Sequence, residues 1–407
     1  MIRWIVENRL GTAAYHEAST SGHDVLDVRH LVDGPGNGAH GTLALIERGA
    51  AMMASGKPLI VACDFGVSRS NSIAAGVLVR AQKLGFDEAA RIVIAQTGEE
   101  NIKLSMLDTV RAALNSSKGA DHSTGAVLIT GGSGFVGRNL VSGLSAKRDE
   151  PVLAPSRSKL DLTANSVALA SYLRENNVRQ IVHLAFPRIY TNVPAMGESL
   201  IMLRRLIEAC VTQNITLTIL SGAVVFSGYK TRNLLADLDT TPRAMHVYGE
   251  TKLLEETLVR QNMQNSGLLA RIVRLAPVYG PTGLRPRFIR QFHDALQAGQ
   301  GIQVHSYING PARLELLYID DAVAALSEII GRNLPGNFHI GTGVHYSPAE
   351  VAEQIAELTG TKLTVDTSAL NEHVSNVVLG AQSDRAELSW TPKTPLLVGL
   401  KRTIAAF

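Results

Sequence analysis

The chain has 407 residues, of which 45% are hydrophobic and 18% are charged, as in ordinary globular proteins with two or three domains. Its formal net charge of +3 is mild, and no basic run is dense enough to indicate a nucleic acid or a membrane surface as a partner. No apolar run approaches the roughly 18 residues of a membrane span, and two cysteines, Cys63 and Cys210, give no disulfide framework. We therefore expect a cytoplasmic protein that acts on small molecules.

The predicted elements form two groups in chain order, on either side of a polar stretch at residues 116–124. In the first group, residues 1–115, the pattern predicts strands at 25–28 and 58–62 and helices at 42–55, 71–84, 86–97 and 102–114. In the second group, residues 125–407, apolar runs at 126–130, 151–154, 180–184 and 217–221 alternate with amphipathic stretches, which is typical of a parallel sheet. We therefore predict two α/β domains, 1–115 and 125–407, joined by a linker.

A thiol and a guanidinium six residues apart, Cys63 and Arg69, stand in a turn between a buried strand and a helix. Backbone N–H groups of such a loop point inward at the helix N-terminus, where they favour an anion and lower the pKa of a thiol. The planar fork of Arg69 can hold two phosphoryl oxygens. This spacing predicts a phosphate-binding site with Cys63 as the nucleophile.

Residues 1–115 resemble the dual-specificity branch of the cysteine-dependent tyrosine phosphatases. The similarity lies in Cys63-x5-Arg69 followed by Ser70, and in residues 4–14, which are similar to the first strand and "LG" turn of that family. The resemblance implies a phosphatase-like α/β fold in which the Cys63 thiolate attacks a phosphate ester and water hydrolyses the phosphocysteine. It further implies that Arg69 and the loop N–H groups hold the charge, while Ser70 steadies the departing thiolate.

That family takes its general acid from an aspartate about 30 residues upstream of the nucleophile, in a mobile loop at a strand end. Asp33 stands thirty residues before Cys63 and is followed by turn residues, so it is our candidate. Asp27 and His30 are its rivals for the role.

Two positions depart from the phosphatase pattern. The histidine that usually precedes the nucleophile is replaced by Ala62, so that support for the thiolate is missing. Asp64 places a negative charge inside the loop, which disfavours polyanionic substrates and favours a phosphate monoester.

A second motif begins with an apolar strand at 126–130 that leads directly into Gly131-x-x-Gly134-x-x-Gly137 and an apolar helix. Glycines at this spacing make a tight turn, admit a pyrophosphate and let helix pack on strand. From residue 125 to the end the chain resembles the extended short-chain dehydrogenase/reductase family, the NAD-dependent epimerases and dehydratases of nucleotide sugars. The similarity continues in Ile181–Ala185, Tyr248–Lys252, Val278–Pro281, Tyr318–Asp321 and Phe338–Gly343. It implies a Rossmann-type doubly wound parallel sheet with a small C-terminal substrate lobe.

The same resemblance assigns the catalytic groups of this second domain. Tyr248 would be the proton donor or acceptor at the sugar oxygen, and Lys252, one helical turn on, would hold the ribose and support that proton transfer. The usual third residue is a serine or threonine, but Gly222 stands at its place. Ser221 is expected to face the other side of the strand, so a local shift would be needed to bring it or Ser227 inward.

The cofactor prediction rests on the end of the second strand of this domain, where an acid would hold the ribose of NAD and a basic residue the 2′-phosphate of NADP. Residues 154–158 contain Arg157 and no acid, which favours NADP and leaves NAD open, while Asp161 is a candidate for the adenine amino group. The predicted cofactor-binding residues are Gly131, Ser133, Gly134, Phe135, Val136, Gly137, Arg157, Asp161, Leu162, Leu184, Ala185, Tyr248 and Lys252.

Two active-site frames in one chain predict a bifunctional enzyme. One half would remove phosphate from a small metabolite, such as a sugar phosphate or a nucleoside monophosphate, and the other would oxidise, reduce or epimerise a sugar carbon. Leu314 and Pro277 stand where the family often has Arg and Asn, so the usual nucleotide-sugar substrate stays open. The alternatives are a regulatory protein phosphatase whose second domain senses NADP(H), and a reductase whose first domain only binds phosphate. The resemblance to the dehydrogenase/reductase family also implies a possible homodimer, formed through two helices of the second domain.

Overall fold

The computed structural model describes residues 2–33, 37, 39–116, 125–164, 166–283, 287–384 and 388–407. The chain divides into two compact units, one of Met1–Asp121 with Arg260–Leu269 and the other of His122–Val259 with Ala270–Phe407. Apart from Ser116, the predicted linker 116–124 lies outside the described residues. Within the described ranges, no helix is both long and apolar enough to cross a membrane.

The first unit is built on a four-stranded sheet in the order β1-β2-β4-β3. Strand β4 lies between β2 and β3 and is parallel to both, while β1 is antiparallel to β2. All five residues of β4 are buried, as its uninterrupted apolar sequence requires. The strands are β1 Arg3–Val6, β2 Leu10–Ala14, β3 Asp24–Asp27 and β4 Leu59–Cys63, and the helices are α1 Tyr15–Ala18, α2 Ala39–Ala54, α3 Arg69–Gln82, α4 Phe86–Thr97 and α5 Leu104–Ser116.

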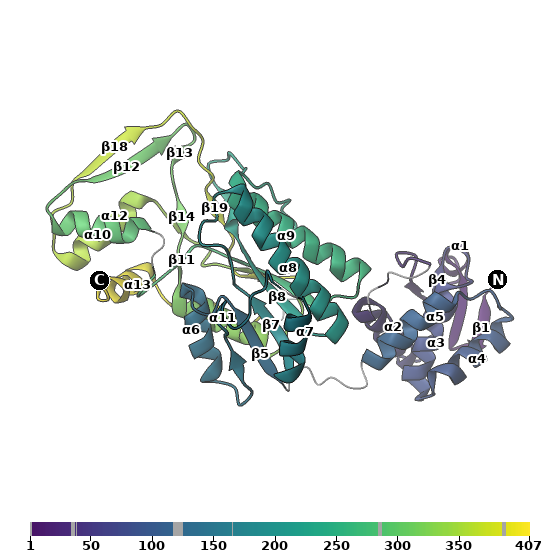
Figure 1. Cartoon of the computed structure of the whole chain (residues 1–407). Helices are drawn as coiled ribbons and strands as arrows, with labels where there is room; N and C mark the ends of the chain where they lie inside the picture. The colour runs from purple at the N-terminus through teal and green to yellow at the C-terminus, as the bar shows by residue number, and fades with distance from the viewer. Residues whose placement is uncertain are drawn as a thin grey trace. The chain divides into compact units, whose positions relative to one another are not determined.

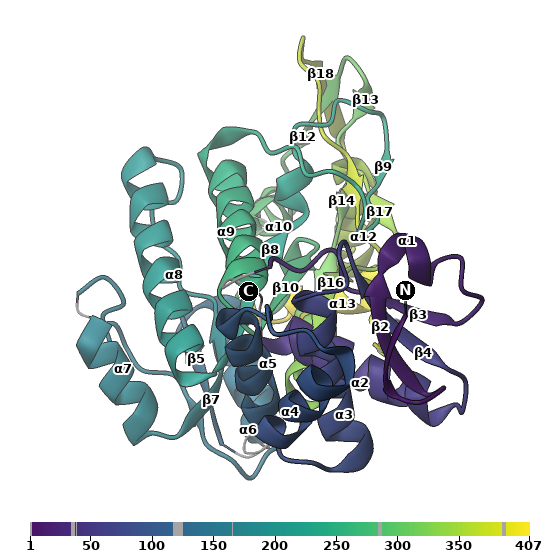
Figure 2. The same cartoon turned by 90° about the vertical axis from the view of Figure 1, so that its right-hand side faces the viewer.

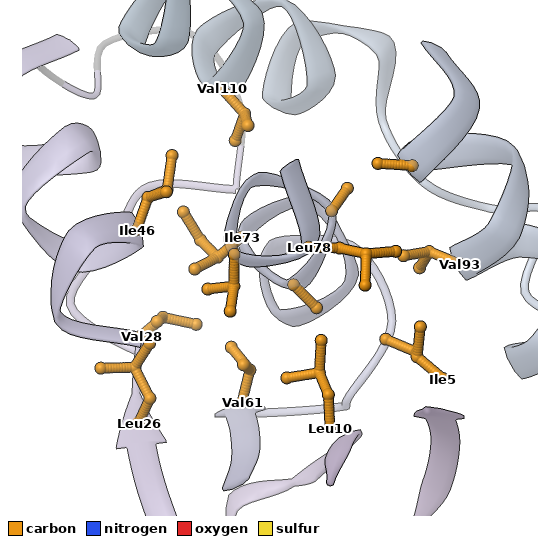
Figure 3. Packing of buried hydrophobic residues seen from close by; sticks show 14 of the residues in the cluster. Ile5, Leu10, Leu26, Val28, Ile46, Val61, Ile73, Leu78, Val93 and Val110 are labelled. Carbon is orange, nitrogen blue, oxygen red and sulfur yellow. The ribbon is translucent and has the colours of Figure 1, made fainter. Parts of the chain in front are cut away.

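Helix α3 packs across the centre of this sheet. Figure 3 shows Leu10, Leu26 and Val61 of three strands facing Ile73 and Leu78 of α3, in a cluster that α2, α4 and α5 complete. Most boundaries in this unit lie within three residues of the sequence prediction, and the following differences bear on the site. The expected "LG" turn is strand β2, because its residues pair with both β1 and β4; strand β4 extends one residue further, to Cys63; and α3 begins at Arg69 instead of Asn71.

The second unit contains a seven-stranded sheet in the order β20-β16-β10-β8-β7-β5-β6, parallel except for β20. Helices α6 and α11 pack their apolar residues on one face of it. Helices α8 and α9, which lie side by side, cover the other face with α7 (Figures 1 and 2). The strands are β5 Ala126–Thr130, β6 Val152–Leu153, β7 Val178–His183, β8 Thr216–Gly222, β10 Ala270–Leu275, β16 Gly336–Ile340 and β20 Gln382–Ser383. The helices are α6 Phe135–Ser145, α7 Ser166–Glu175, α8 Val193–Gln213, α9 His246–Asn265, of which residues 260–265 are grouped with the first unit, and α11 Ile319–Gly331.

This sheet is the predicted Rossmann-like fold, and a smaller lobe follows it. The lobe packs α10, α12 and α13 around an apolar cluster beside the small sheet of β12, β13 and β18. Its elements and the remaining short ones are η1 Ala223–Phe226, β9 Leu234–Leu235, β11 Val278–Tyr279, α10 Arg287–Gln297, β12 Ile302–Tyr307, β13 Gly310–Pro311, β14 Leu314–Glu315, β15 Leu317–Tyr318, β17 His345–Tyr346, α12 Pro348–Thr359, β18 Val365–Ala369, β19 Val377–Val378 and α13 Leu396–Ile404.

The chain order of the strands reverses at β5, which lies between β6 and β7. In an open parallel sheet, ligands bind at the carboxyl ends of the strands at such a switch point. The glycine motif follows β5 directly and Leu184 follows β7, so the fold itself places both at this crevice.

Candidate functional site

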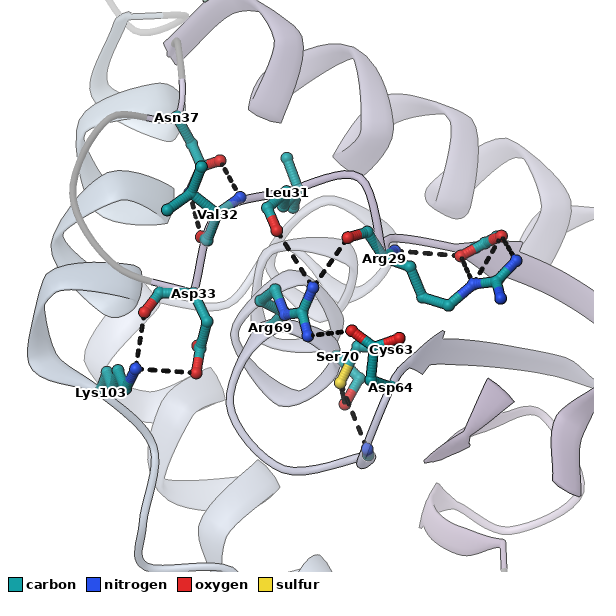
Figure 4. A network of polar contacts seen from close by, with 12 residues as sticks. Arg29, Leu31, Val32, Asp33, Asn37, Cys63, Asp64, Arg69, Ser70 and Lys103 are labelled. Carbon is teal, nitrogen blue, oxygen red and sulfur yellow. Dashed lines mark hydrogen bonds and ion pairs between the residues drawn. The ribbon is translucent and has the colours of Figure 1, made fainter. Parts of the chain in front are cut away.

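Cys63 ends β4 and is followed by a five-residue loop that leads into α3. Its buried Sγ accepts a hydrogen bond from the N–H of Gly66 at 3.2 Å and donates to Ser70 Oγ at 3.4 Å (Figure 4). Burial raises the pKa of the Cys63 thiol, but the Ser70 hydroxyl and the backbone N–H groups of Ser70, Phe65 and Val67 outweigh it, so the pKa lies below its usual value. The loop therefore stabilises a thiolate without the histidine that Ala62 replaces.

Gly66 allows the loop to close tightly on the sheet. Its φ is +69°, and a Cβ there would lie 2.6 Å from the carbonyl carbon of Ala13 in β2. Only glycine fits both the left-handed backbone and this approach.

Arg69 is held in place by groups from two directions. One of its terminal nitrogens donates to the carbonyls of Arg29 at 2.8 Å and Leu31 at 3.1 Å, and the other donates to the Asp64 carboxylate at 2.5 Å (Figure 4). Its side chain is 11% exposed, whereas that of Asp64 is 51% exposed. An incoming phosphate would therefore compete with Asp64 for this guanidinium.

Asp33 forms an ion pair with Lys103, whose ammonium lies 2.9 Å from the carboxylate. Figure 4 shows this carboxylate pointing to Lys103 and not to Cys63. Burial raises the pKa of Asp33, but the hydrogen bonds from Lys103 and the Ser68 hydroxyl lower it by more, so the net pKa is below its usual value. A general acid must carry a proton, so this role requires the Lys103 ion pair to open.

The two rivals of Asp33 lie elsewhere. Asp27 accepts three hydrogen bonds from the Arg29 guanidinium, which itself lies 3.3 Å over the Tyr15 ring. The hydrogen bond from Arg29 is the largest influence on the pKa of Asp27 and keeps it below its usual value. His30 is exposed at the surface.

In the second unit, the glycine motif forms the turn between β5 and α6. Gly131 has a φ of +71°, and a Cβ there would lie 2.6 Å from the Ala185 nitrogen. A Cβ on Gly137 would lie 2.3 Å from the Gly131 carbonyl oxygen, so the turn and the helix meet only because both are glycine. This close approach leaves the loop backbone open to a ligand at the N-terminus of α6.

Two adjoining pockets, of about 880 Å³ and 910 Å³, share this glycine loop. Together they are large enough for the two halves of a dinucleotide. The structure brings together all thirteen predicted cofactor-binding residues and Ser221. The first pocket is lined by Gly131, Ser133, Gly134, Arg157, Asp161, Leu162, Leu184 and Ala185, and the second also by Phe135, Val136, Gly137, Ser221, Tyr248 and Lys252.

Arg157 lies at the first pocket with its side chain 67% exposed. Its guanidinium forms ion pairs with Glu198 at 2.8 Å and with Asp161 at 3.4 Å. Asp161 also accepts hydrogen bonds from the N–H and the hydroxyl of Thr163, which lower its pKa. This part of the pocket thus combines one base with two acids. The sequence indicated only one of these acids, Asp161, as a candidate for the adenine amino group.

Tyr248 and Lys252 lie on α9 at the second pocket. The Tyr248 ring packs edge-on against Phe186 and Tyr190, at centroid distances of 5.4 Å and 4.9 Å. Lys252 donates to the Leu220 carbonyl at 3.0 Å, so its ammonium is held at the carboxyl end of β8. Two aromatic rings therefore form a wall that sequence reasoning did not find, because both belong to the loop between β7 and α8.

Ser221 faces the helix that carries Tyr248, contrary to the expectation from the sequence. It pairs in register with Arg274 of β10, and Arg274 forms a buried ion pair with Glu256 of α9. Residues paired across strands share a face of the sheet, so Ser221 points toward α9 without a local shift. Its buried hydroxyl has no hydrogen-bond partner among the described residues.

The fold and these pockets define a Rossmann-type α/β domain with a Tyr–Lys pair at the second pocket. The chain belongs to the NAD dependent epimerase/dehydratase family, whose pattern matches residues 127–341. It is 30% identical over 270 residues to a UDP-N-acetyl-alpha-D-glucosaminuronate decarboxylase of Bacillus cytotoxicus, covering 57% of this chain and 79% of that relative.

Two solved structures share this fold. The UDP-glucose 4-epimerase of Thermus thermophilus, in complex with NAD, has a TM-score of 0.59 at 21% identity and covers 69% of this chain and 98% of that one. RMD from Pseudomonas aeruginosa, complexed with NADPH, has a TM-score of 0.58 at 19% identity and covers 70% and 98%. The family match lies wholly outside residues 1–115.

Proposed function

We propose that the second unit oxidises, reduces or epimerises a sugar carbon of a nucleotide sugar with a nicotinamide dinucleotide. The observation that carries this proposal is the Tyr248–Lys252 pair at a pocket continuous with the glycine loop. The bound dinucleotide would supply hydride transfer. Tyr248 would exchange a proton with the sugar oxygen, Lys252 would hold the ribose hydroxyls, and the unpartnered hydroxyl of Ser221 would donate to that same sugar oxygen.

We propose NADP as the preferred dinucleotide, because Arg157 is exposed at the ribose end of the pocket. A 2′-phosphate would take the place of one of its two carboxylate partners. Asp161 and Glu198, the two acids beside Arg157, could also bind the ribose hydroxyls of NAD. NAD is therefore the alternative dinucleotide, and both are tested.

The experiment for this function follows the cofactor absorbance at 340 nm with UDP-, GDP- and dTDP-sugars in the presence of NAD(H) or NADP(H). We expect a substrate-dependent change that Tyr248→Phe reduces by about 100-fold or more. Epimerisation returns its hydride, so product analysis must accompany the absorbance. Full activity of Tyr248→Phe would contradict the assignment, and dinucleotide binding without any turnover would favour the sensing domain.

We propose phosphomonoester hydrolysis at Cys63 as a second function, supported by the hydrogen bonds that stabilise its thiolate. Cys63 would attack phosphorus, Arg69 would exchange Asp64 for two phosphoryl oxygens, and Ser70 would stabilise the leaving thiolate. Asp33 would protonate the leaving alkoxide once freed from Lys103. A small sugar phosphate or a nucleoside monophosphate would be the substrate of this first unit, and the chain would then be bifunctional.

The test measures phosphate release from p-nitrophenyl phosphate, a phosphotyrosine peptide, sugar phosphates and nucleoside monophosphates. We expect Cys63→Ser to lower turnover by about 1,000-fold or more. Turnover confined to the peptide and altered by NADP(H) would favour a regulatory protein phosphatase. No turnover, with phosphate still bound, would leave only an anion-binding loop.

We also propose that two copies of the chain pair through α8 and α9. Ile201 of α8 and Leu254 of α9 are large apolar side chains exposed by 49% and 42%. Sedimentation of the wild type and of an Ile201→Glu/Leu254→Glu variant tests this proposal.

A further inference from the structure

A buried ion pair lies directly behind the Tyr–Lys site. Lys252 Nζ lies 2.9 Å from Glu255 Oε2, and their side chains are only 11% and 2% exposed. The second oxygen of Glu255 accepts a 2.5 Å hydrogen bond from Ser199 of α8. Glu255 is therefore fixed from two helices, and neither of its oxygens faces solvent.

The surroundings of the Lys252 ammonium are fully specified. It donates to Glu255 and to the Leu220 carbonyl, and it lies 4.5 Å from the centroid of the Phe186 ring. These three contacts aim the ammonium at the pocket from a fixed position. Without Glu255, the remaining contacts are a neutral carbonyl and a ring.

The other titratable groups near Lys252 do not replace Glu255. Tyr248 and Glu256 share its helix, but Glu256 is already paired with Arg274. His183 of β7 is fully buried, and burial lowers its pKa to about 4, so it is neutral at pH 7. Burial lowers the pKa of Lys252, whereas the Glu255 carboxylate raises it and leaves the net pKa above its usual value.

We propose that Glu255 is a positioning residue that keeps Lys252 charged and fixed, with Ser199 as its anchor. The proposal rests on the function proposed above only in taking the ligand of Lys252 to be a dinucleotide. Removing Glu255 alone would leave a buried, uncompensated ammonium, and removing both charges would not.

The first test needs no ligand. It is a double-mutant cycle on the full chain, followed by thermal unfolding, with Glu255→Gln, Lys252→Met and their combination. We expect each single variant to lower the Tm by roughly 10 °C and the double variant to lower it by less than either. Glu250→Gln, which removes a charge from the exposed face of the same helix, is the matched control and leaves the Tm within about 2 °C.

If Glu255→Gln alone shows no thermal unfolding transition, the proposal requires that the Glu255→Gln/Lys252→Met double variant shows one. Additive Tm changes, or a double variant that stays unfolded, would overturn the proposal.

The pH dependence separates a charge effect from a loss of packing. In the wild type the pKa of Lys252 is higher in the folded chain than in the unfolded chain, where it is about 10.4. The resulting stabilisation is complete below this unfolded pKa and is lost as pH rises through the folded pKa. In Glu255→Gln the pKa of Lys252 in the folded chain would fall below its pKa in the unfolded chain. The stability of this variant would therefore increase as pH rises from the folded pKa to the unfolded pKa. We therefore expect the Tm deficit of Glu255→Gln to be largest near pH 7 and to narrow toward pH 10. A deficit independent of pH would assign Glu255 a packing role only.

The second measurement is the affinity for NADH and NADPH by fluorescence between pH 6 and pH 10. We expect the dinucleotide affinity of the wild type and of Glu250→Gln to stay almost constant between pH 6 and pH 10. We expect Glu255→Gln to lose about ten-fold in affinity as pH rises through the lowered pKa of Lys252. Parallel profiles would contradict the proposal. If the wild type binds neither dinucleotide, the proposed function fails, and the ligand-free cycle still decides the role of Glu255.

Discussion

At the scale of single residues, ion pairs control the groups proposed to act in both sites. Lys103 holds Asp33, Asp64 holds Arg69, and Arg157 is shared between two acids. A salt bridge at a partly exposed position contributes little to stability, but it changes the protonation or availability of a functional group. These pairs are therefore best tested through activity and binding.

Lys103→Met tests Asp33 as the general acid. Lys103 lowers the pKa of Asp33, so its removal raises that pKa and keeps the carboxyl protonated to higher pH. We expect the alkaline limb of phenyl phosphate hydrolysis to move about one pH unit higher. Phenyl phosphate is used because its leaving group needs a proton more than p-nitrophenolate does. Lys57→Met, at an exposed lysine, is the control, and an unmoved limb would leave Asp27 or His30 as the acid.

Arg157→Ala tests the choice of dinucleotide. A charge-assisted contact to the 2′-phosphate is expected to contribute roughly 1.5–3 kcal/mol, so NADPH affinity should fall about 10-fold or more while NADH affinity stays within about three-fold. The measurement is fluorescence titration of both dinucleotides. Equal losses for NADH and NADPH would show that Arg157 orders the pocket without reading the 2′-phosphate.

At the scale of elements, the β4–α3 loop depends on one glycine. Gly66 and Gly98 have nearly equal φ values of +69° and +65°, but a Cβ would meet backbone atoms of Ala13 and Ala14 only at Gly66. We expect Gly66→Ala to cost roughly 3 kcal/mol of unfolding free energy and Gly98→Ala about 1 kcal/mol. Chemical denaturation measures both, and equal costs would show that the loop relaxes away from β2.

The elements also show where sequence reasoning stops. The bounds predicted for helix 86–97 and strand 126–130 are those of the structure, because a glycine directly precedes and follows each segment. The face of Ser221 could not be predicted, because it depends on the register of β8 with β10 and on which helix covers that face. Glu255 follows Lys252 by three residues, so helical spacing was the available signal for their pairing.

At the scale of the whole molecule, each unit has its own apolar core. The first contains residues such as Leu26, Ile73 and Val110, and the second contains Val127 and Phe338. We expect a chain separated at Ser117 to give two parts that each fold, with Cys63-dependent hydrolysis kept within about three-fold. Circular dichroism and phosphate release measure this outcome. A part that fails to fold would show that its core depends on the other.

The two local motifs, Cys63-x5-Arg69 and Gly131-x-x-Gly134-x-x-Gly137, could be recognised from the order of residues alone. Each is a short loop between a strand and a helix, and its chemistry depends on neighbours along the chain. The hydrogen-bond partners of the site residues come from distant parts of the chain and depend on how it folds. Arg69 meets the Arg29 carbonyl forty positions away, and Ser199 meets Glu255 fifty-six positions away. Packing of helices and strands brings such groups together, so these contacts cannot be predicted from the hydrophobic pattern of any single segment.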